Sequence, residues 1–301
     1  MLFSQIQLDL SQNPEKVAFF TTCMNRLHHL KKTLPQNIKD NQDYENCVFV
    51  VLNYNSKDGL HEWMLENMAE QIKNGTVIYY RTLEPPFFWH NHAKNMAAKC
   101  TPDDAEIICS IDSDNYTSTD NNNIGLAVQL NEIFNHWWGQ DIFVRAAGWE
   151  HQGKGWHLHP HKYSSASGKI ATRRADFFKY RGFNENLRGY YFDEEELWKR
   201  LEIVAGFKKI TLPVEYSKFI DHPNYERLIN LDPSIVNKSK LEALKKENHA
   251  FIEGNFMTEE DVKDHYQNGW ENQKKTDEIL EKKIEITNGD WGEGKVERIL
   301  L

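Results

Sequence analysis

Two aspartates separated by one residue, Asp112 and Asp114, directly follow a short apolar segment at 107–111. A segment this short and this rich in isoleucine predicts a buried strand. Residues i and i+2 of an extended chain point to the same side, so both carboxylates can face one point where the strand leaves its sheet. Two carboxylates at one point repel each other unless a cation lies between them, and a hard divalent cation with oxygen ligands meets that need.

The same two aspartates have a simpler interpretation. Asp and Asn are frequent in turns, so Asp-Ser-Asp-Asn could form only a polar turn after the strand. An EF-hand calcium loop is excluded, because the sixth position from Asp112 is Thr117 where that loop needs Gly, and the twelfth is Asn123 where it needs Glu. The choice between a metal site and a turn depends on the rest of the chain.

The composition is that of a globular, enzyme-sized chain. Its 301 residues, of which 40% are hydrophobic, can bury a full core. The net charge of −9 disfavours a general nucleic-acid binder, which usually carries a basic face. No apolar run of about 18 residues is present, so we expect no transmembrane segment, and the first residues lack the pattern of a signal peptide. Four cysteines without metal-type spacing favour reduced thiols and a cytoplasmic protein: Cys23, Cys47, Cys100 and Cys109.

Apolar segments and helical patterns alternate through the first 120 residues. Strands are predicted at 17–22, 47–52, 76–80 and 107–111, with a helical pattern between each pair. This alternation predicts a parallel sheet covered on both faces, and ligands bind such sheets at the carboxyl ends of the strands. The polar residues that follow the strands all fall at that edge: Asn25, Arg26, Asn53, Asn55, Asp112 and Asp114.

Beyond residue 121 the pattern is looser. A helix is predicted over 126–134, and a long loop rich in Gly and His covers 151–168. A second helix over 192–207 has acidic residues in its first turn, where the helix dipole favours them. A last strand is predicted at 208–216, and the mixture of Lys and Glu with Leu and Ile in 231–301 predicts solvated amphipathic helices.

Several of these segments resemble the GT-A glycosyltransferases, in particular their family-2-like and galactosyltransferase-like branches. Asp112-Ser113-Asp114 is similar to the metal-binding D-x-D of that family, and residues 93–97 (A-K-N-M-A) to its R/K-N-x-G/A segment. Residues 182–185 (G-F-N-E) and 189–197 (G-Y-Y-F-D-E-E-E-L) resemble G-F-D-E and G-W-G-x-E-D-D-D-L. The resemblance covers residues 17 to about 225.

Two positions depart from the family pattern. Asn53 stands where the family often has an Asp associated with the nucleotide base, which leaves the base open. The acidic pair is Asp193-Glu194 rather than Glu-Asp, which leaves the register of the catalytic carboxylate open.

The resemblance implies an α/β GT-A fold, which is Rossmann-like, with a mostly parallel central sheet flanked by helices. It implies a catalytic domain over 1–230, with a nucleotide-sugar half at about 1–120 and an acceptor half at about 121–230. Residues 231–301 are then expected to form a helical C-terminal extension.

The implied activity is transfer of a sugar from a nucleotide diphosphate, with a UDP-sugar expected as donor, to an acceptor hydroxyl with inversion. Mn²⁺ or Mg²⁺ held by Asp112 and Asp114 would act as a Lewis acid on the diphosphate. His222, in a turn after the last predicted strand, is the expected third ligand, although a histidine in a turn is more often simply solvated. Glu194, or in second place Asp193, is the expected general base; the helix dipole alone also explains acids at this position.

Other residues are expected to bind the substrates. The candidates for the nucleotide-sugar are Thr22, Asn25, Arg26, Asn53, Lys94 and Ser113. The candidates for the acceptor are Trp156, Tyr190 and Tyr191, of which Trp156 is expected to stack on a sugar from a flexible loop. Three alternating histidines follow Trp156: His157, His159 and His161. Without a fourth metal ligand nearby they are a weak signal for zinc.

The sequence leaves more than one acceptor and more than one class of protein open. The acidic charge favours a saccharide or lipid-linked glycan, at the cytoplasmic face of a membrane with the protein peripheral to it. The alternative is a modified base in DNA, as some phage transferases use, for which the chain lacks a basic stripe. A nucleotidyltransferase-like enzyme usually has a Gly-rich loop after the first strand, which residues 21–26 lack. A catalytically inactive binding module is disfavoured because the carboxylates of both candidate sites are retained.

Overall fold

The computed structural model describes most of the chain, and all structural statements concern this part. The described residues are 14–118, 124–146, 150–151, 156–157, 168–189, 192–222, 225–235, 269–284 and 291–301.

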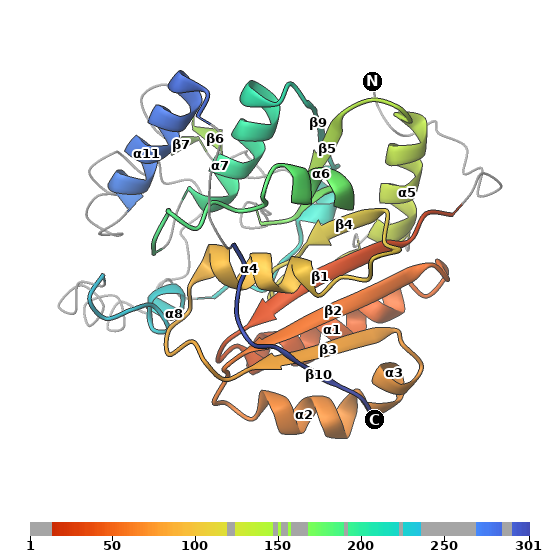
Figure 1. Cartoon of the computed structure of the whole chain (residues 1–301). Helices are drawn as coiled ribbons and strands as arrows, with labels where there is room; N and C mark the ends of the chain where they lie inside the picture. Colours follow the sequence, from red (N-terminus) through yellow and green to blue (C-terminus); the bar gives the residue numbers. More distant parts are fainter. Residues whose placement is uncertain are drawn as a thin grey trace.

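A central sheet of eight strands runs through the molecule in the order β10-β3-β2-β1-β4-β8-β5-β9 (Figure 1). Its strands are β1 (Val17–Cys23), β2 (Cys47–Tyr54), β3 (Val77–Thr82), β4 (Ile107–Ser110), β5 (Ile142–Arg145), β8 (Ile170–Arg173), β9 (Lys208–Thr211) and β10 (Glu297–Ile299). A separate antiparallel pair consists of β6 (Glu150–His151) and β7 (Trp156–His157).

Helices cover both faces of this sheet. They are α1 (Leu27–Asp40), α2 (Leu60–Asn67), α3 (Ala69–Lys73), α4 (His90–Lys99), α5 (Leu126–His136), α6 (Arg174–Lys179), α7 (Asp193–Lys199), α8 (Tyr225–Leu228) and α11 (Gly269–Lys282). The π-helical turn η2 (Arg200–Val204) extends α7, and the 3-10 turn η3 (Val214–Ser217) follows β9.

The first four strands form the parallel half of the sheet, as their apolar sequences predict. Strand β1 pairs in parallel with both β2 and β4, and β2 pairs in parallel with β3. Every residue of β1 is buried, because β1 lies at the centre with helices on both sides. The chain reverses after β4: β8 is antiparallel to both β4 and β5, and β9 is parallel to β5.

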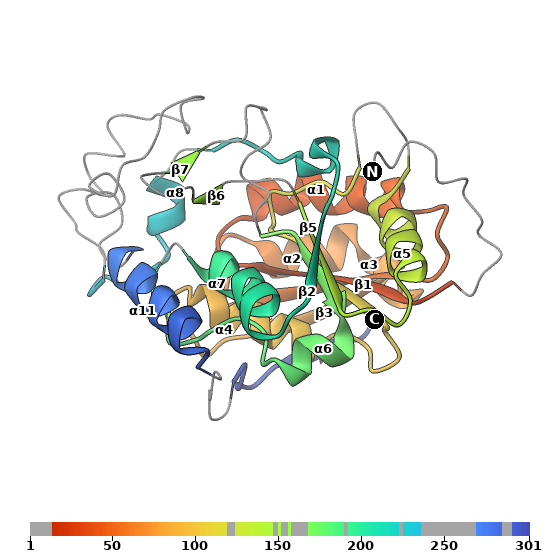
Figure 2. The same ribbon diagram turned by 90° about the horizontal axis from the view of Figure 1, so that it is seen from above.

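Two hydrophobic layers enclose the sheet. On one face, α1, α2 and α5 pack residues such as Leu30, Met64 and Leu130 against it. On the other face, α4, α6 and α7 do the same with residues such as Met96 and Phe177. Figure 2 shows the two groups of helices on opposite sides of the strands. The expected α/β fold, mostly parallel and flanked by helices, is confirmed.

The C-terminal end of the chain returns to the sheet. Strand β10 pairs antiparallel with β3, so residues from the predicted extension 231–301 complete the edge of the sheet (Figure 1). Helix α11 also belongs to this region, which therefore contains a strand as well as helix. The division into two domains at residue 230 stays a prediction.

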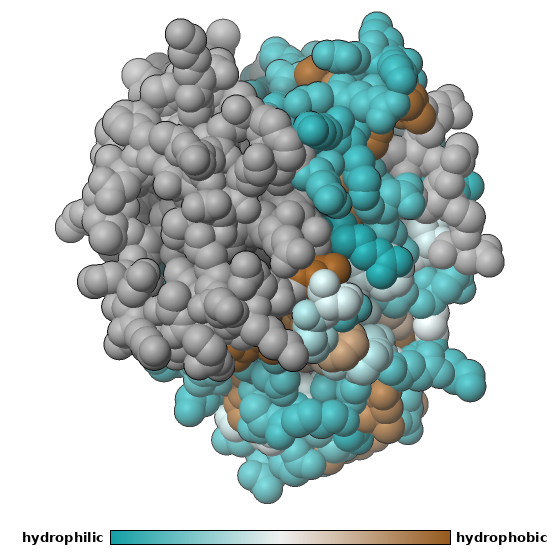
Figure 3. Space-filling view, turned by 90° about the vertical axis from the view of Figure 1, so that its left-hand side faces the viewer, coloured by the Kyte–Doolittle hydropathy of each residue, from teal (hydrophilic) through white to brown (hydrophobic). Residues whose placement is uncertain are grey.

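None of the described helices combines the length and the apolar character that crossing a bilayer requires. Figure 3 shows the side of the molecule that carries α8 and α11, where the described surface is mainly hydrophilic with small hydrophobic groups between.

Asn95 on α4 connects two of the segments that resemble the family pattern. It is fully buried, and its Nδ2 donates to the Phe183 carbonyl at 2.8 Å and to Glu185 Oε1 at 2.8 Å. Its Oδ1 accepts from the Phe183 backbone N–H at 2.9 Å. A Cβ on Gly182 would lie 2.5 Å from Asn95 Oδ1, so only glycine allows this approach. Asn95 therefore fixes the turn that leads into α7.

We expect Asn95→Ala to lower the free energy of unfolding by about 2–4 kcal/mol, because it removes these hydrogen bonds and leaves buried partners unpaired. Urea unfolding followed by circular dichroism measures the change. Asn67→Ala is the matched control, since Asn67 is exposed and bonds only the Trp63 carbonyl at 3.0 Å among the described contacts. Equal stability of the two variants would contradict this role of Asn95.

Candidate functional site

A pocket lies at the carboxyl ends of β1 and β4, beside the first turn of α7; we call it the carboxylate pocket. Among its lining residues are those predicted from sequence: Thr22, Arg26, Asp112, Ser113, Asp114, Glu194 and His222. The others were not predicted: Met24, His29, Phe88, His90, Glu226, Asn230 and Leu231. The structure therefore brings the D-x-D segment, the acidic helix start and the histidine turn to one place.

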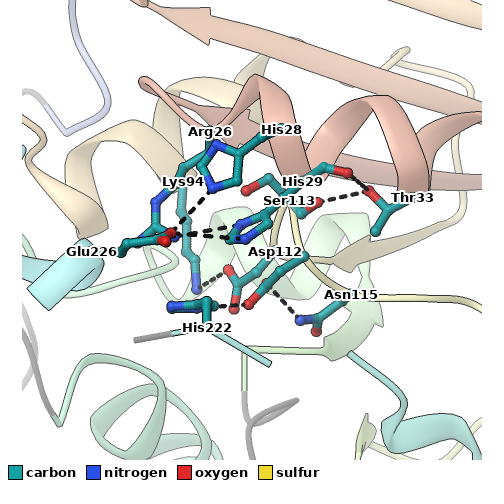
Figure 4. A network of polar contacts seen from close by, with 11 residues as sticks. Arg26, His28, His29, Thr33, Lys94, Asp112, Ser113, Asn115, His222 and Glu226 are labelled. Carbon is teal, nitrogen blue, oxygen red and sulfur yellow. Dashed lines mark hydrogen bonds and ion pairs between the residues drawn. The ribbon is translucent and has the colours of Figure 1, made fainter. Parts of the chain in front are cut away.

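The chain after β4 positions Asp114 against His222. Asn115 forms an antiparallel bridge with Phe219, and the Ile220 N–H donates to the Asp114 carbonyl at 2.8 Å. This pairing brings His222 Nε2 to 3.1 Å from Asp114 Oδ2, with both residues buried. Asn115 Nδ2 donates to the other carboxylate oxygen, Oδ1, at 2.9 Å. Figure 4 shows His222, Asp112 and Lys94 pointing toward one another.

The donor atoms at this point fit a divalent metal. Asp114 Oδ2 and His222 Nε2 are 3.1 Å apart, a hydrogen-bond distance that is also close to the about 3 Å between adjacent ligands of an ion with bonds of about 2.1 Å. Asp112 adds a second carboxylate to the same pocket. A Cβ on Gly168 would lie 2.2 Å from Asp112 Oδ2, so the glycine lets the chain entering β8 pack on this carboxylate. The two carboxylates suit Mn²⁺ or Mg²⁺.

Lys94 joins this point to the acidic helix. Its Nζ lies 3.1 Å from Asp112 Oδ1 and 2.5 Å from Glu194 Oε1, and its side chain is 3% exposed. Burial lowers the pKa of Lys94, but the charges of Asp112 and Glu194 raise the pKa above its usual value overall. The sequence predicts Lys94 as a nucleotide ligand; the structure places it behind the pocket, between two carboxylates.

The two carboxylates in the first turn of α7, Asp193 and Glu194, have pKa values shifted in opposite directions. Asp193 is bonded to His90 Nδ1, and His90 Nε2 lies 4.0 Å from Glu194 Oε1. Burial raises the pKa of Asp193, but the charge and hydrogen bond of His90 hold that pKa below its usual range. Burial and the charge of Asp193 raise the pKa of Glu194 to about 7, against the opposing effect of Lys94. Glu194 is thus the better proton acceptor of the two.

A second polar group borders the pocket on the side of α8. Arg26 Nη1 lies 2.5 Å from Glu226 Oε2, and His28 Nε2 lies 3.1 Å from the same oxygen. The ring centroids of His29 and His222 are 5.0 Å apart. Burial lowers the pKa of His29 to about 4, so its imidazole is neutral near pH 7.

Two sets of described residues have ligand atoms that all lie within 4.8 Å of one another, and Asp112, Asp114 and His222 are not among them: His28, His29 and Glu226, and His90, Asp193 and Glu194. In each set a fixed cation already contacts a carboxylate, Arg26 in the first and Lys94 in the second. A metal ion there would be repelled by that cation. Lys94 also contacts Asp112, at 3.1 Å, so this argument does not separate the three sets, and Asp112, Asp114 and His222 as metal ligands stay a prediction.

Two predicted nucleotide ligands shape loops instead of lining the pocket. Asn53 is fully buried; its Nδ2 donates to the Tyr79 hydroxyl at 3.0 Å, and its Oδ1 accepts from the Ser56 N–H at 2.8 Å. Asn25 has φ 56°, accepts from the Lys57 N–H at 2.7 Å and donates to Asn230 Oδ1 at 2.8 Å. Both amides hold the segments after β1 and β2 in place.

The predicted acceptor ligands are not placed. Tyr190 and Tyr191 lie outside the described residues, and Trp156 is described only by its backbone in β7.

Of two pocket residues that were not predicted, one had a recognisable pattern in the sequence and the other had none. His90 lies four residues before Lys94, so both project from one side of α4, and that spacing could have identified it. Glu226 has no such signal, because its contact with Arg26 joins segments 200 residues apart.

Known structures of similar fold include glycosyltransferases. The mannosyltransferase PcManGT from Pyrobaculum calidifontis, in complex with GDP-Man and Mn²⁺, matches with a TM-score of 0.50 and 16% identity over 69% of this chain and 59% of its own. GalNAc-T7 with UDP, GalNAc and Mn²⁺ matches with a TM-score of 0.51 and 16% identity over 67% of this chain and 43% of its own. This chain thus spans less than two thirds of either protein. At such identities the likeness shows a shared GT-A-type fold.

No protein-family model matches the sequence, and no curated protein matches it.

Proposed function

We propose that this chain is a metal-dependent glycosyltransferase, which moves a sugar from a nucleotide diphosphate to an acceptor hydroxyl. The observation that carries the proposal is the carboxylate pocket, in which the Asp112, Asp114 and His222 group faces Glu194 across Lys94. The GT-A-type fold supports it, since PcManGT and GalNAc-T7 carry nucleotide or nucleotide-sugar ligands with Mn²⁺.

We place the leaving group, the nucleoside diphosphate, beside Asp114. Asp112, Asp114 and His222 would hold Mn²⁺ or Mg²⁺, which when bound supplies a Lewis acid for the diphosphate oxygens. The chain itself fixes these ligands in advance, Asp112 through Lys94 and Asp114 through Asn115. We expect a UDP-sugar as donor, with the nucleotide near the other predicted residues of this pocket: Thr22, Arg26 and Ser113.

The acceptor belongs on the side of Glu194. Glu194 takes the proton of the acceptor hydroxyl as the hydroxyl oxygen attacks the anomeric carbon. The bond from that carbon to the diphosphate oxygen breaks, and the nucleoside diphosphate leaves with the electron pair. One direct displacement of this kind inverts the anomeric centre. Asp193 is bonded to His90 and therefore positions the turn rather than acting as the base.

The acceptor we propose is a saccharide. A net charge of −9 opposes binding to the phosphates of duplex DNA, so the DNA-base alternative is less favoured.

Incubation with UDP- and GDP-sugars should release free nucleoside diphosphate in the presence of Mn²⁺ and not in excess EDTA. Replacing both metal candidates, Asp112→Asn with Asp114→Asn, should reduce this release by about 100-fold or more, because the charge of the leaving group is no longer neutralised. Asp43→Asn is the control, since Asp43 is exposed. The proposal fails if no donor is turned over, or if the double variant behaves like the unaltered protein.

Transfer should depend on Glu194 and on its ionisation. Glu194→Gln should lower kcat by about 10²- to 10⁴-fold, the range of general-base catalysis, while Glu66→Gln, an exposed residue of α2, should not. The base must be deprotonated and its pKa is raised to about 7, so the rate should be full above that pH and fall as pH is lowered through it. A pH–rate profile measures both effects. A flat profile between pH 5 and 8, or full activity of the Gln variant, would remove Glu194 from this role.

A further inference from the structure

A second pocket, of about 320 Å³, lies across Phe88 from the carboxylate pocket. Its wall includes Tyr54, Phe87 and Trp89, and we call it the aromatic pocket. His92 and Arg188 also line it, together with the apolar residues Pro85, Pro86 and Ile235. Neither its residues nor its position were predicted from the sequence.

The rings of the aromatic pocket are fixed by their neighbours. Tyr54 Oη and His92 Nδ1 are 2.7 Å apart, and the rings of His92 and Trp89 are stacked with centroids 4.8 Å apart. The guanidinium of Arg188 lies 4.4 Å from the centroid of the Trp89 ring. His92 Nε2 is bonded to the Glu293 carbonyl at 2.7 Å. A ligand would therefore meet a preformed surface and lose little affinity to ordering it.

Three consecutive residues join this pocket to the catalytic carboxylates. Phe88 lines both pockets, Trp89 lines the aromatic pocket, and His90 lines the carboxylate pocket and bonds Asp193. Arg188 and Gly189, which also line the aromatic pocket, precede α7 in the sequence. The aromatic pocket thus opens beside the Glu194 half of the site, where the acceptor is expected.

The polar groups around the rings suit an uncharged ligand with several hydroxyls. Glu84 and Asp232 add carboxylates to the wall, opposite in charge to Arg188. Aromatic faces pack on the apolar side of a sugar ring, and fixed charged groups bond its hydroxyls. Because Phe88 separates the two pockets, a ligand that reaches both must be larger than one sugar ring.

We infer that the aromatic pocket binds the second ring of a saccharide acceptor whose terminal hydroxyl lies at Glu194. The inference rests on the proposed function. It assigns to this chain an acceptor of at least two sugar units, with the packed group of Trp89, His92 and Arg188 as the main contact surface.

The test compares methyl glycosides of matched mono- and disaccharides of glucose, galactose, mannose and xylose as acceptors. The unaltered protein should show a kcat/KM at least about 10-fold higher for one disaccharide than for its monosaccharide. Trp89→Ala should reduce the ratio of the disaccharide kcat/KM to the monosaccharide kcat/KM to about 2 or less. Trp89→Phe should keep most of this ratio, because an aromatic ring remains. Trp138→Ala is the control, since Trp138 is 71% exposed and does not line either pocket.

A ratio near one in the unaltered protein, or an unchanged ratio in Trp89→Ala, would overturn the inference. A higher donor KM in Trp89→Ala with an unchanged ratio would also overturn it and assign the pocket to the nucleotide base. If no donor releases nucleoside diphosphate, it is the proposed function that fails. Tryptophan fluorescence, measured without donor, then tests the pocket separately. Saturable quenching by a disaccharide that is lost in Trp89→Ala supports saccharide binding in the aromatic pocket. Absence of such quenching in the unaltered protein contradicts it.

Discussion

The buried ammonium group of Lys94 is the interaction on which the candidate site depends. It lies between Asp112 and Glu194, which come from the end of the β4 segment and from α7. Without it, these carboxylates and Asp193 would repel one another where Asp193 and Glu194 are largely shielded from water. Breaking such a buried pair costs about 3–5 kcal/mol, because a charge remains without compensation. The position of α4 therefore sets how the proposed metal ligand Asp112 and the proposed base Glu194 lie relative to each other.

The fold holds α4 from two sides. Asn91 and Asn95 donate to the carbonyls of Asn184 and Phe183, which ties the helix to the segment before α7. The C-terminal residues hold the other side: the Gly292 N–H donates to Glu185 Oε1 at 2.6 Å, and the Glu293 carbonyl bonds His92. The same His92 supports the aromatic pocket. The end of the chain thus supports residues of both pockets, although none of residues 291–301 is among the described lining residues of either.

The parallel half of the sheet could be predicted because strands buried on both faces read as continuous apolar runs, and their carboxyl ends then locate Asp112 and Asp114. The reversal at β8 and the return of β10 could not, because each depends on pairing between distant segments rather than on local pattern. The same holds for the amide network that removes Asn53 from the pocket lining. Local pattern predicted several residues that the fold gathers in one pocket, and tertiary packing decides which polar groups line it.

The most direct test of the central claim is the location of the metal. Crystals grown with Mn²⁺ and UDP, measured at the manganese absorption edge, show where the ion binds through its anomalous scattering. The strongest anomalous peak should lie within bonding distance of Asp114 Oδ2 and His222 Nε2, on the side of Asp112. A peak at His90, Asp193 and Glu194, a peak at His28, His29 and Glu226, or no peak in this pocket would contradict the assignment of the leaving-group side.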